Sequence, residues 1–131
     1  MSSARRGLLR QAGFTLIELL VVMAIIATLA SIAAPRYFNS LEKSREVALK
    51  ANLKSMREAI DQYYQDKGTW PQSLEDLVKF RYLREIPIDP VTHESNTWVL
   101  VLPQTSSESG IRDVRSGAQG QSREGQRYED W

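Results

Sequence analysis

The residue that raises the clearest chemical question is Glu18, a carboxylate inside a long apolar stretch near the start of the chain. A lone charge at the centre of a bilayer costs roughly 2.5–3.5 kcal/mol. A plain membrane anchor therefore leaves Glu18 unexplained, unless its side chain lies near the membrane surface and reaches water.

Catalytic and metal-binding patterns are not found elsewhere in the sequence. The chain has no cysteine, and His93, its one histidine, lies in a turn-like segment without an acid pair in a recognisable arrangement. The glycine-rich segment 117–125 precedes no predicted helix, so it lacks the context of a nucleotide-binding loop. We therefore expect a protein that is not an enzyme.

The apolar stretch is long enough to cross a membrane as a helix. It runs from residue 14 to residue 34, and at 1.5 Å per residue it spans about 32 Å, roughly one hydrocarbon core. The residues before it include three arginines and no acid, which predicts a cytoplasmic N-terminus and an exported C-terminal part; these are Arg5, Arg6 and Arg10. A cleaved secretory signal fits less well, since its apolar part has only about 7–15 residues.

The segment "GFTLIELLVVMAIIATLASIAAPRY", Gly13 to Tyr37, closely resembles the N-terminal signature of type IV pilins and type II secretion pseudopilins. The resemblance implies that a prepilin peptidase cuts between Gly13 and Phe14 and methylates the new amino group of Phe14. It also implies a role for Glu18, whose carboxylate would pair with the N-terminal amine of another subunit in a filament. We expect Pro35 to kink the helix, because proline has no amide hydrogen to donate.

Beyond Pro35, apolar residues recur at spacings of mostly three and four, which predicts a helix with one buried face that continues to about Asp66. These positions are Leu41, Ala48, Leu49, Leu53, Met56, Ile60, Tyr63 and Tyr64. We interpret the opposite charged face, which includes Glu46, as solvated surface. Gly68 suits the C-terminal cap of this helix, and Pro71 prevents its continuation.

The rest of the chain predicts a small head. Residues 73–80 are expected to form a short helix that begins with a capping box of Ser73 and Asp76. The prolines of segment 82–90 predict an extended linker, and residues 97–103 and 110–117 predict two strands. The tryptophans are expected in the core of this head, and they are Trp70, Trp98 and Trp131.

The expected fold is therefore α+β and pilin-like, with a long N-terminal helix, transmembrane in its first half, packed on a small antiparallel sheet. We divide the chain into a cytoplasmic leader peptide at 1–13, a transmembrane and filament-core helix at 14–35, and a periplasmic head at 36–131.

The order of segments from residue 13 to about residue 90 resembles the major pseudopilin of type II secretion. Members of that family usually carry an acidic calcium-binding loop near the C-terminus, where this chain has "RSGAQGQSREGQRYEDW". We expect no cofactor, with calcium as the open alternative, and a flexible, solvated tail that Tyr128 and Trp131 tie to the head. The side-chain oxygens available to calcium do not match an EF-hand spacing; they belong to Asp113, Ser116, Glu124, Glu129 and Asp130.

The resemblance implies a structural subunit of a type II secretion pseudopilus, which drives protein secretion. Its partners would be further copies of itself in a helical filament, prepilin peptidase, minor pseudopilins, the inner-membrane assembly platform and membrane lipid. With 17 basic and 16 acidic residues, the charge balance does not favour nucleic acid. We expect a single pass through the bacterial inner membrane with the head in the periplasm.

Two alternatives stay open. The first is a pilin or minor pilin of a type IV pilus, serving adhesion, motility or DNA uptake; the missing cysteines argue modestly against it, because many such pilins close a loop with a disulfide. The second is a membrane-anchored binding domain or enzyme that never polymerises.

Overall fold

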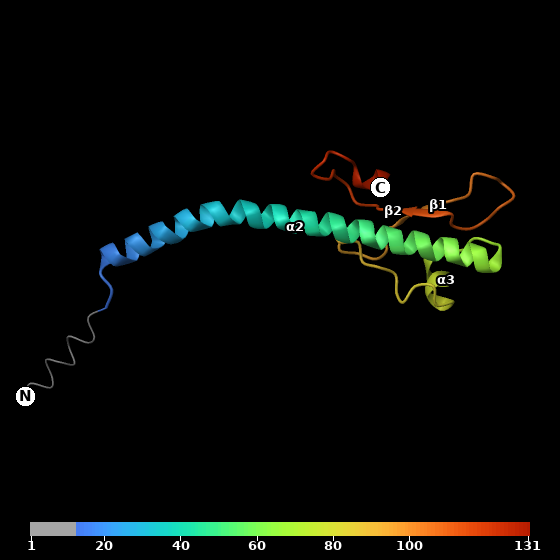
Figure 1. Ribbon diagram of the computed structural model, residues 1–131, viewed down its shortest axis with the longest axis horizontal. Coiled ribbons are helices and arrows are strands. Elements are labelled where there is room, and N and C mark those ends of the chain that lie inside the picture. Colours follow the sequence, from blue (N-terminus) through green and yellow to red (C-terminus); the bar gives the residue numbers. More distant parts are fainter. Residues whose placement is uncertain (1–12) are drawn as a thin grey trace, which may run out of the picture. The chain divides into compact units, whose positions relative to one another are not determined.

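The computed structural model describes residues 13–131, so Arg5, Arg6 and Arg10 of the predicted leader lie outside the described residues. The main elements are α2 (Leu16–Lys67), α3 (Leu74–Lys79), β1 (Val99–Val101) and β2 (Asp113–Arg115), followed by a short 3-10 helix, η1, at Tyr128–Asp130 (Figure 1). A long N-terminal helix with a two-stranded antiparallel sheet confirms the expected α+β, pilin-like fold. The chain divides into two compact units after Asn39.

Helix α2 has 52 residues and remains helical through Pro35. Proline inside a helix removes one backbone hydrogen bond at a cost of about 3 kcal/mol, which the many bonds on either side of it outweigh. The kink expected at Pro35 stays a prediction. The C-terminus of α2 is as the sequence predicts: Gly68 has φ 70° and donates its amide to the Tyr64 carbonyl at 2.8 Å.

The core of the head lies on one face of the second half of α2. Leu49, Leu53, Met56, Ile60 and Tyr63 are buried there at alternating spacings of four and three, as predicted. Side chains from α3, from β2 and from the segments just before the two strands complete this core, and they are Leu74, Leu77, Trp98, Ile111 and Val114. Within this unit, Figure 1 shows the sheet and α3 on different sides of α2.

The prediction is wrong for two of the positions expected in this core. Ala48 and Tyr64 are exposed, and Ala59 is buried instead. A helix face follows a period of 3.6 residues, so a neighbour of a core residue in sequence lies about 100° away from it around the axis. Tyr64 stacks on Trp70, which is partly buried against the edge of the core, with ring centroids 4.1 Å apart.

The two strands pair over three residues each, shorter than the segments that the sequence predicts. The pairs are Val99↔Arg115, Leu100↔Val114 and Val101↔Asp113. Val114 is buried, whereas its neighbours Asp113 and Arg115 are less so, which is the alternation of a strand with one covered face. The linker at 82–90 contains neither helix nor strand, as predicted.

The prediction of a capping box at the start of α3 is wrong. Ser73 occupies the N-cap position with an extended backbone, but its side chain makes no cap hydrogen bond. The Asp76 carboxylate instead accepts the amide of Gln72 at 3.1 Å, one residue further back than the box requires.

Candidate functional site

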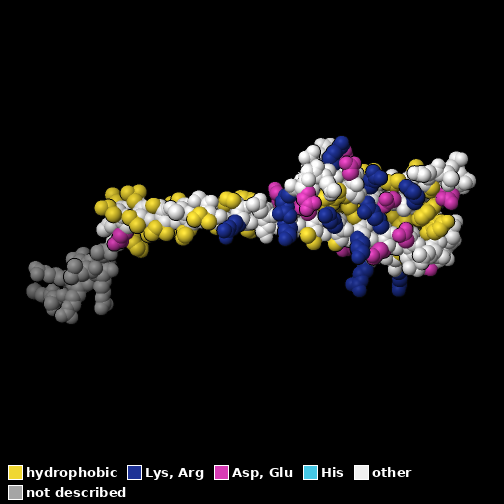
Figure 2. Space-filling model, turned by 45° about the horizontal axis from the view of Figure 1, so that its top comes forward, with side chains coloured by type: hydrophobic (Ala, Val, Ile, Leu, Met, Phe, Trp, Pro, Cys, Tyr) yellow, Lys and Arg dark blue, Asp and Glu magenta, His cyan; other side chains and the backbone are white. Residues whose placement is uncertain are grey.

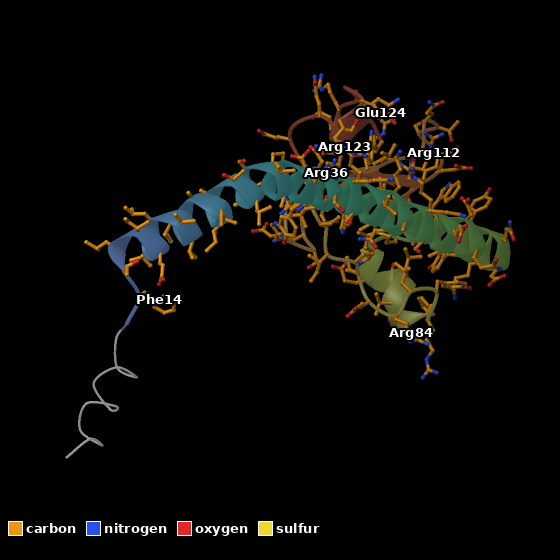
Figure 3. The ribbon with its side chains drawn as sticks, turned by 60° about the vertical axis from the view of Figure 1, so that its left-hand side comes forward. Phe14, Arg36, Arg84, Arg112, Arg123 and Glu124 are labelled. Carbon is orange, nitrogen blue, oxygen red and sulfur yellow. The ribbon has the colours of Figure 1, made fainter. Side chains whose placement is uncertain are left out.

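The bond between Gly13 and Phe14 lies in an irregular segment directly before α2 (Figure 3). Phe14 is 87% exposed, and a Cβ atom added at Gly13 would meet no atom of the described residues within 4 Å. An exposed segment without regular structure is the kind of backbone that proteases cleave. The bond is therefore accessible within the described part of the chain.

Glu18 lies in the first turn of α2, and its backbone is part of a helix cap. The Glu18 amide donates to the Thr15 hydroxyl at 3.1 Å, and the Leu19 amide donates to the Thr15 carbonyl at 3.1 Å. Thr15 is therefore the N-cap residue, and "TLIE" has the spacing of a capping box, a signal that our reading of the sequence missed. The unpaired amides at this end of the helix also favour a negative charge.

The first half of α2 offers an apolar surface to its surroundings. Every described residue up to Ser40 is exposed within this chain, and hydrophobic side chains cover the segment before residue 40 (Figure 2). By length and composition α2 could cross a membrane. So much exposed apolar surface needs a lipid or protein environment outside this chain.

The polar side chains in the first half of α2 differ in whether they have a hydrogen-bond partner. The hydroxyls of Thr28 and Ser31 donate to backbone carbonyls of the same helix at 2.8 and 2.7 Å. Within residues 13–131, the carboxylate of Glu18 makes no hydrogen bond or ion pair. Glu18 is thus the side chain of this segment that still needs a partner in an apolar environment.

An aromatic pair follows the apolar stretch and was not singled out from the sequence. Tyr37 and Phe38 are exposed, with ring centroids 5.8 Å apart in an edge-to-face arrangement, and Arg36 precedes them (Figure 3). Aromatic and basic residues are typical of the level where a membrane meets water. Their position directly after residue 35 marks the end of the segment that suits an apolar environment.

The C-terminal segment is solvated only in part, so the expectation of a solvated tail holds for some of its residues and not for others. Residues 119–121 and 123–127 are exposed, whereas Ser116, Ala118 and Ser122 are buried. The aromatic tie is confirmed: the rings of Tyr128 and Trp131 lie 5.2 Å apart at their centroids and both pack against the core.

Two buried acids hold this segment in place, and the sequence did not reveal either role. Glu46, read as solvated surface, is 8% exposed and accepts hydrogen bonds from Arg123. Asp89 is fully buried; one of its oxygens accepts the amides of Val91 and Thr92, and the other accepts the Ser116 hydroxyl at 2.7 Å. Asp followed by Pro is a turn signal that could have indicated the Asp89 turn.

The oxygens considered for calcium do not come together. Asp113 lies on β2 and binds Arg57, Ser116 binds Asp89, and Glu124 is exposed on the C-terminal segment (Figure 3). Asp130 is exposed on η1. Within residues 13–131 no group of three or more acidic, histidine or cysteine side chains could hold a metal ion.

Partial burial and the nearby carboxylates of Glu46 and Glu42 raise the pKa of Tyr128 above its ordinary value of 10.0, although Arg45 and Arg123 oppose this. The folded state therefore favours the protonated phenol. That contribution to stability is complete below the ordinary pKa and is lost as the pH rises through the raised one.

We expect the free energy of unfolding of the head to fall between about pH 9 and about pH 11, and to fall less steeply in Tyr128→Phe. Denaturant unfolding of the detergent-solubilised chain, followed by near-ultraviolet circular dichroism, measures both slopes. Tyr82, whose pKa a hydrogen bond to Asp66 raises, remains in the variant and contributes equally to both proteins. Identical slopes would show that Tyr128 has no part in the alkaline transition.

Comparisons with known proteins identify the N-terminal segment as a known sequence motif. Residues 8–34 match the prokaryotic N-terminal methylation motif. The chain is 32% identical over 123 residues to the type II secretion system core protein G of Escherichia coli K12, which covers 82% of this chain and 81% of that protein. It is also 32% identical over 97 residues to the protein of the same name from Pseudomonas aeruginosa, covering 62% of this chain and 68% of that one.

Similarity to pilins is present over a shorter span. The chain is 29% identical over 86 residues to the type IV major pilin protein PilE of Neisseria gonorrhoeae, which covers 60% of this chain and 52% of that pilin. No solved structure gave a significant match.

Proposed function

Since this chain belongs to the family of the type II secretion system core protein G, a family of pilin-like structural subunits, we propose that it is a structural subunit of a type II secretion pseudopilus. Prepilin peptidase cuts between Gly13 and Phe14 and methylates the amine of Phe14. The mature subunits then polymerise through residues 14–35. The observation that carries this proposal is the exposed apolar half of α2, with Glu18 in its first turn and no partner for its carboxylate among residues 13–131.

Cleavage would provide the partner that Glu18 lacks. It creates an ammonium group on Phe14, four residues before the acid. When copies of the helix lie side by side with an axial offset, the amine of one copy can approach the Glu18 carboxylate of its neighbour. In an apolar environment the pair is favourable and each charge alone is not. The carboxylate would therefore select the correct offset between subunits.

The same features support a place in the bacterial inner membrane. The basic residues before Gly13 favour a cytoplasmic N-terminus, and Tyr37 and Phe38 suit the opposite membrane surface. The head, residues 36–131, would then lie in the periplasm. Its partners would be further copies of this chain, prepilin peptidase, minor pseudopilins and the assembly platform of the inner membrane. Neither the matched motif nor these relatives indicates catalysis, so we propose no enzymatic activity.

A second candidate is a type IV pilus subunit, because PilE is 29% identical to this chain over 86 residues. The similarity to core protein G extends over more of this chain, 82% against 60%, and favours the secretion pseudopilus. Deletion of the gene separates the two functions: loss of secretion with intact surface pili supports the pseudopilus, whereas loss of pili supports the pilin.

Processing is tested by replacing Gly13 with a bulky residue. We expect Gly13→Leu to accumulate as the full-length precursor in cells that contain the peptidase, because the enzyme must seat a small residue beside the bond that it cuts. Within residues 13–131, a Cβ atom added at Gly13 meets no atom within 4 Å, so the substitution should not disturb the described fold. Intact-mass spectrometry of the membrane-extracted protein measures the outcome.

The control is Gly13→Ala, which keeps a small residue and should retain most of the cleavage. In the wild type we expect an N-methylated Phe14 at the N-terminus. A full-length wild-type chain, or an N-terminus that follows Ala34, would contradict the proposal.

A further inference from the structure

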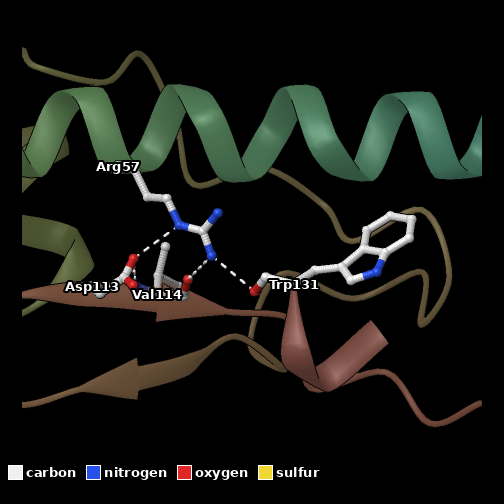
Figure 4. A network of polar contacts seen from close by, with 4 residues as sticks. All are labelled: Arg57, Asp113, Val114 and Trp131. Carbon is white, nitrogen blue, oxygen red and sulfur yellow. Dashed lines mark hydrogen bonds and ion pairs between the residues drawn. The ribbon is translucent and has the colours of Figure 1, made fainter. Parts of the chain in front are cut away.

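Arg57 joins the second half of α2 to two separate parts of the C-terminal segment (Figure 4). Its Nε donates to the Asp113 carboxylate at 2.9 Å, and its Nη2 donates to the backbone carbonyls of Val114 and Trp131 at 3.0 and 2.8 Å. The planar guanidinium carries several donors in a fixed arrangement, so it can hold all three oxygens at once. One side chain therefore links α2, β2 and residue 131.

Glu46 makes a second link from the same helix with the opposite polarity. Its carboxylate accepts the backbone amide of Arg123 at 2.8 Å and lies 3.4 Å from Nε of the same residue. Glu46 and Arg57 are separated by about three helical turns, so they lie on the same face of α2. Between these two links, the Ser116 hydroxyl donates to the buried carboxylate of Asp89.

The three acceptors of Arg57 are the type of ligand that calcium prefers, one carboxylate and two carbonyl oxygens. Calcium, however, takes 6–8 oxygen ligands at 2.3–2.6 Å. Here the Asp113 carboxylate is already paired with the Arg57 guanidinium, and the Ser116 hydroxyl already donates to the Asp89 carboxylate. The residues of this segment therefore do not fit a calcium ion.

We propose that the Arg57 guanidinium, and not a bound metal ion, is the cation that organises the C-terminal segment of this head. It gathers the oxygens of residues 113, 114 and 131, and with the pair of Glu46 and Arg123 it orders the segment 113–131 on α2. The ordering of the head is then independent of calcium. This property concerns the head alone and holds whether or not the chain polymerises.

The experiment is a thermal melt of the full-length protein in detergent, followed by tryptophan fluorescence. All three tryptophans lie in the unit 40–131, so the signal reports on the head. We expect the same melting temperature in excess chelator and in millimolar calcium. A site saturated a hundredfold above its dissociation constant would instead raise the melting temperature by about 10–20 °C.

Arg57→Gln should lower the melting temperature by about 10 °C, and calcium should not restore it. Arg57→Lys keeps the charge but not the fork of donors, so it should lose most of the same stability. The matched control is Lys54→Gln on the same helix, whose ion pair with Glu58 is exposed and should contribute almost nothing.

Two results would overturn the proposal. One is a wild-type melting temperature that rises with calcium and falls with chelator. The other is an Arg57→Gln or Arg57→Lys protein that melts at the wild-type temperature. Should Arg57→Gln fail to fold, Arg57→Lys provides the same comparison.

Discussion

Glu18→Ala is expected to abolish filament formation while leaving cleavage and membrane insertion intact. Removal of a charge from an apolar helix favours insertion, and the accessible bond between Gly13 and Phe14 is unchanged. In the variant, each incoming amine would meet no opposite charge in the apolar core. Leaving one member of a buried ion pair alone costs about 3–5 kcal/mol, which decides whether subunits assemble.

Two further variants separate the charge of Glu18 from its place in the helix cap. Glu18→Gln keeps the backbone amide that donates to Thr15 and removes only the charge, so it should be as defective as alanine. Glu18→Asp keeps the charge on a shorter side chain and should give an intermediate defect. Filament images from cells that overproduce each protein, together with a secretion assay, measure these outcomes.

The head should melt at the same temperature in all these proteins, because Glu18 lies outside the unit that contains the core. A filament defect with an unchanged melt therefore concerns assembly. Normal filaments and normal secretion in Glu18→Ala would contradict the proposed role and leave Glu18 as a capping and interfacial residue.

Gly117→Ala should have the largest effect on the stability of the head. A Cβ atom at this position would clash with the backbone carbonyl oxygen of Thr97. That oxygen belongs to the chain that leads into β1, so relief would require the two strand segments to move apart. Overpacking typically costs about 1–3 kcal/mol, and a clash with a backbone atom is expected at the upper end of that range, which lowers the melting temperature by roughly 10–20 °C.

Gly125→Ala is the matched control. Gly125 has φ 84°, but an added Cβ would meet no atom within 4 Å. Its cost is therefore limited to about 1–2 kcal/mol of backbone strain. A melt followed by tryptophan fluorescence compares the two variants, and equal melting temperatures for Gly117→Ala and wild type would show that the close approach to Thr97 is relieved at no cost.

The sequence predicts those parts of the fold that depend on near neighbours. The spacing of Leu49, Leu53 and Met56 gives the buried face of α2, and Gly68 with Pro71 gives its end. Each of these signals acts within a few residues, through helix geometry or backbone conformation. The same holds for the segment from Gly13 to Glu18, whose order of residues indicates both the accessible bond and the acid.

The interactions that fix the C-terminal segment join residues far apart in the sequence. Glu46 looks like any charged residue on a helix until Arg123, 77 residues later, is placed beside it. Arg57 likewise gives no local signal of its contacts with residues 113–131. The capping box predicted at Ser73 is absent for a local reason and not a long-range one. The short Asp76 side chain accepts the amide of Gln72 instead.

The internal hydrogen bonds of Thr28 and Ser31 bear on how a subunit could leave a filament. Because these hydroxyls donate to the carbonyls of their own helix, their bonds need not be exchanged when the helix moves between lipid and protein. Most of the first half of α2 would then have a similar free energy in either environment, and Glu18 would be the exception. Under the proposed function, disassembly would return an intact helix to the bilayer, where the same subunit could be recycled into another round of growth.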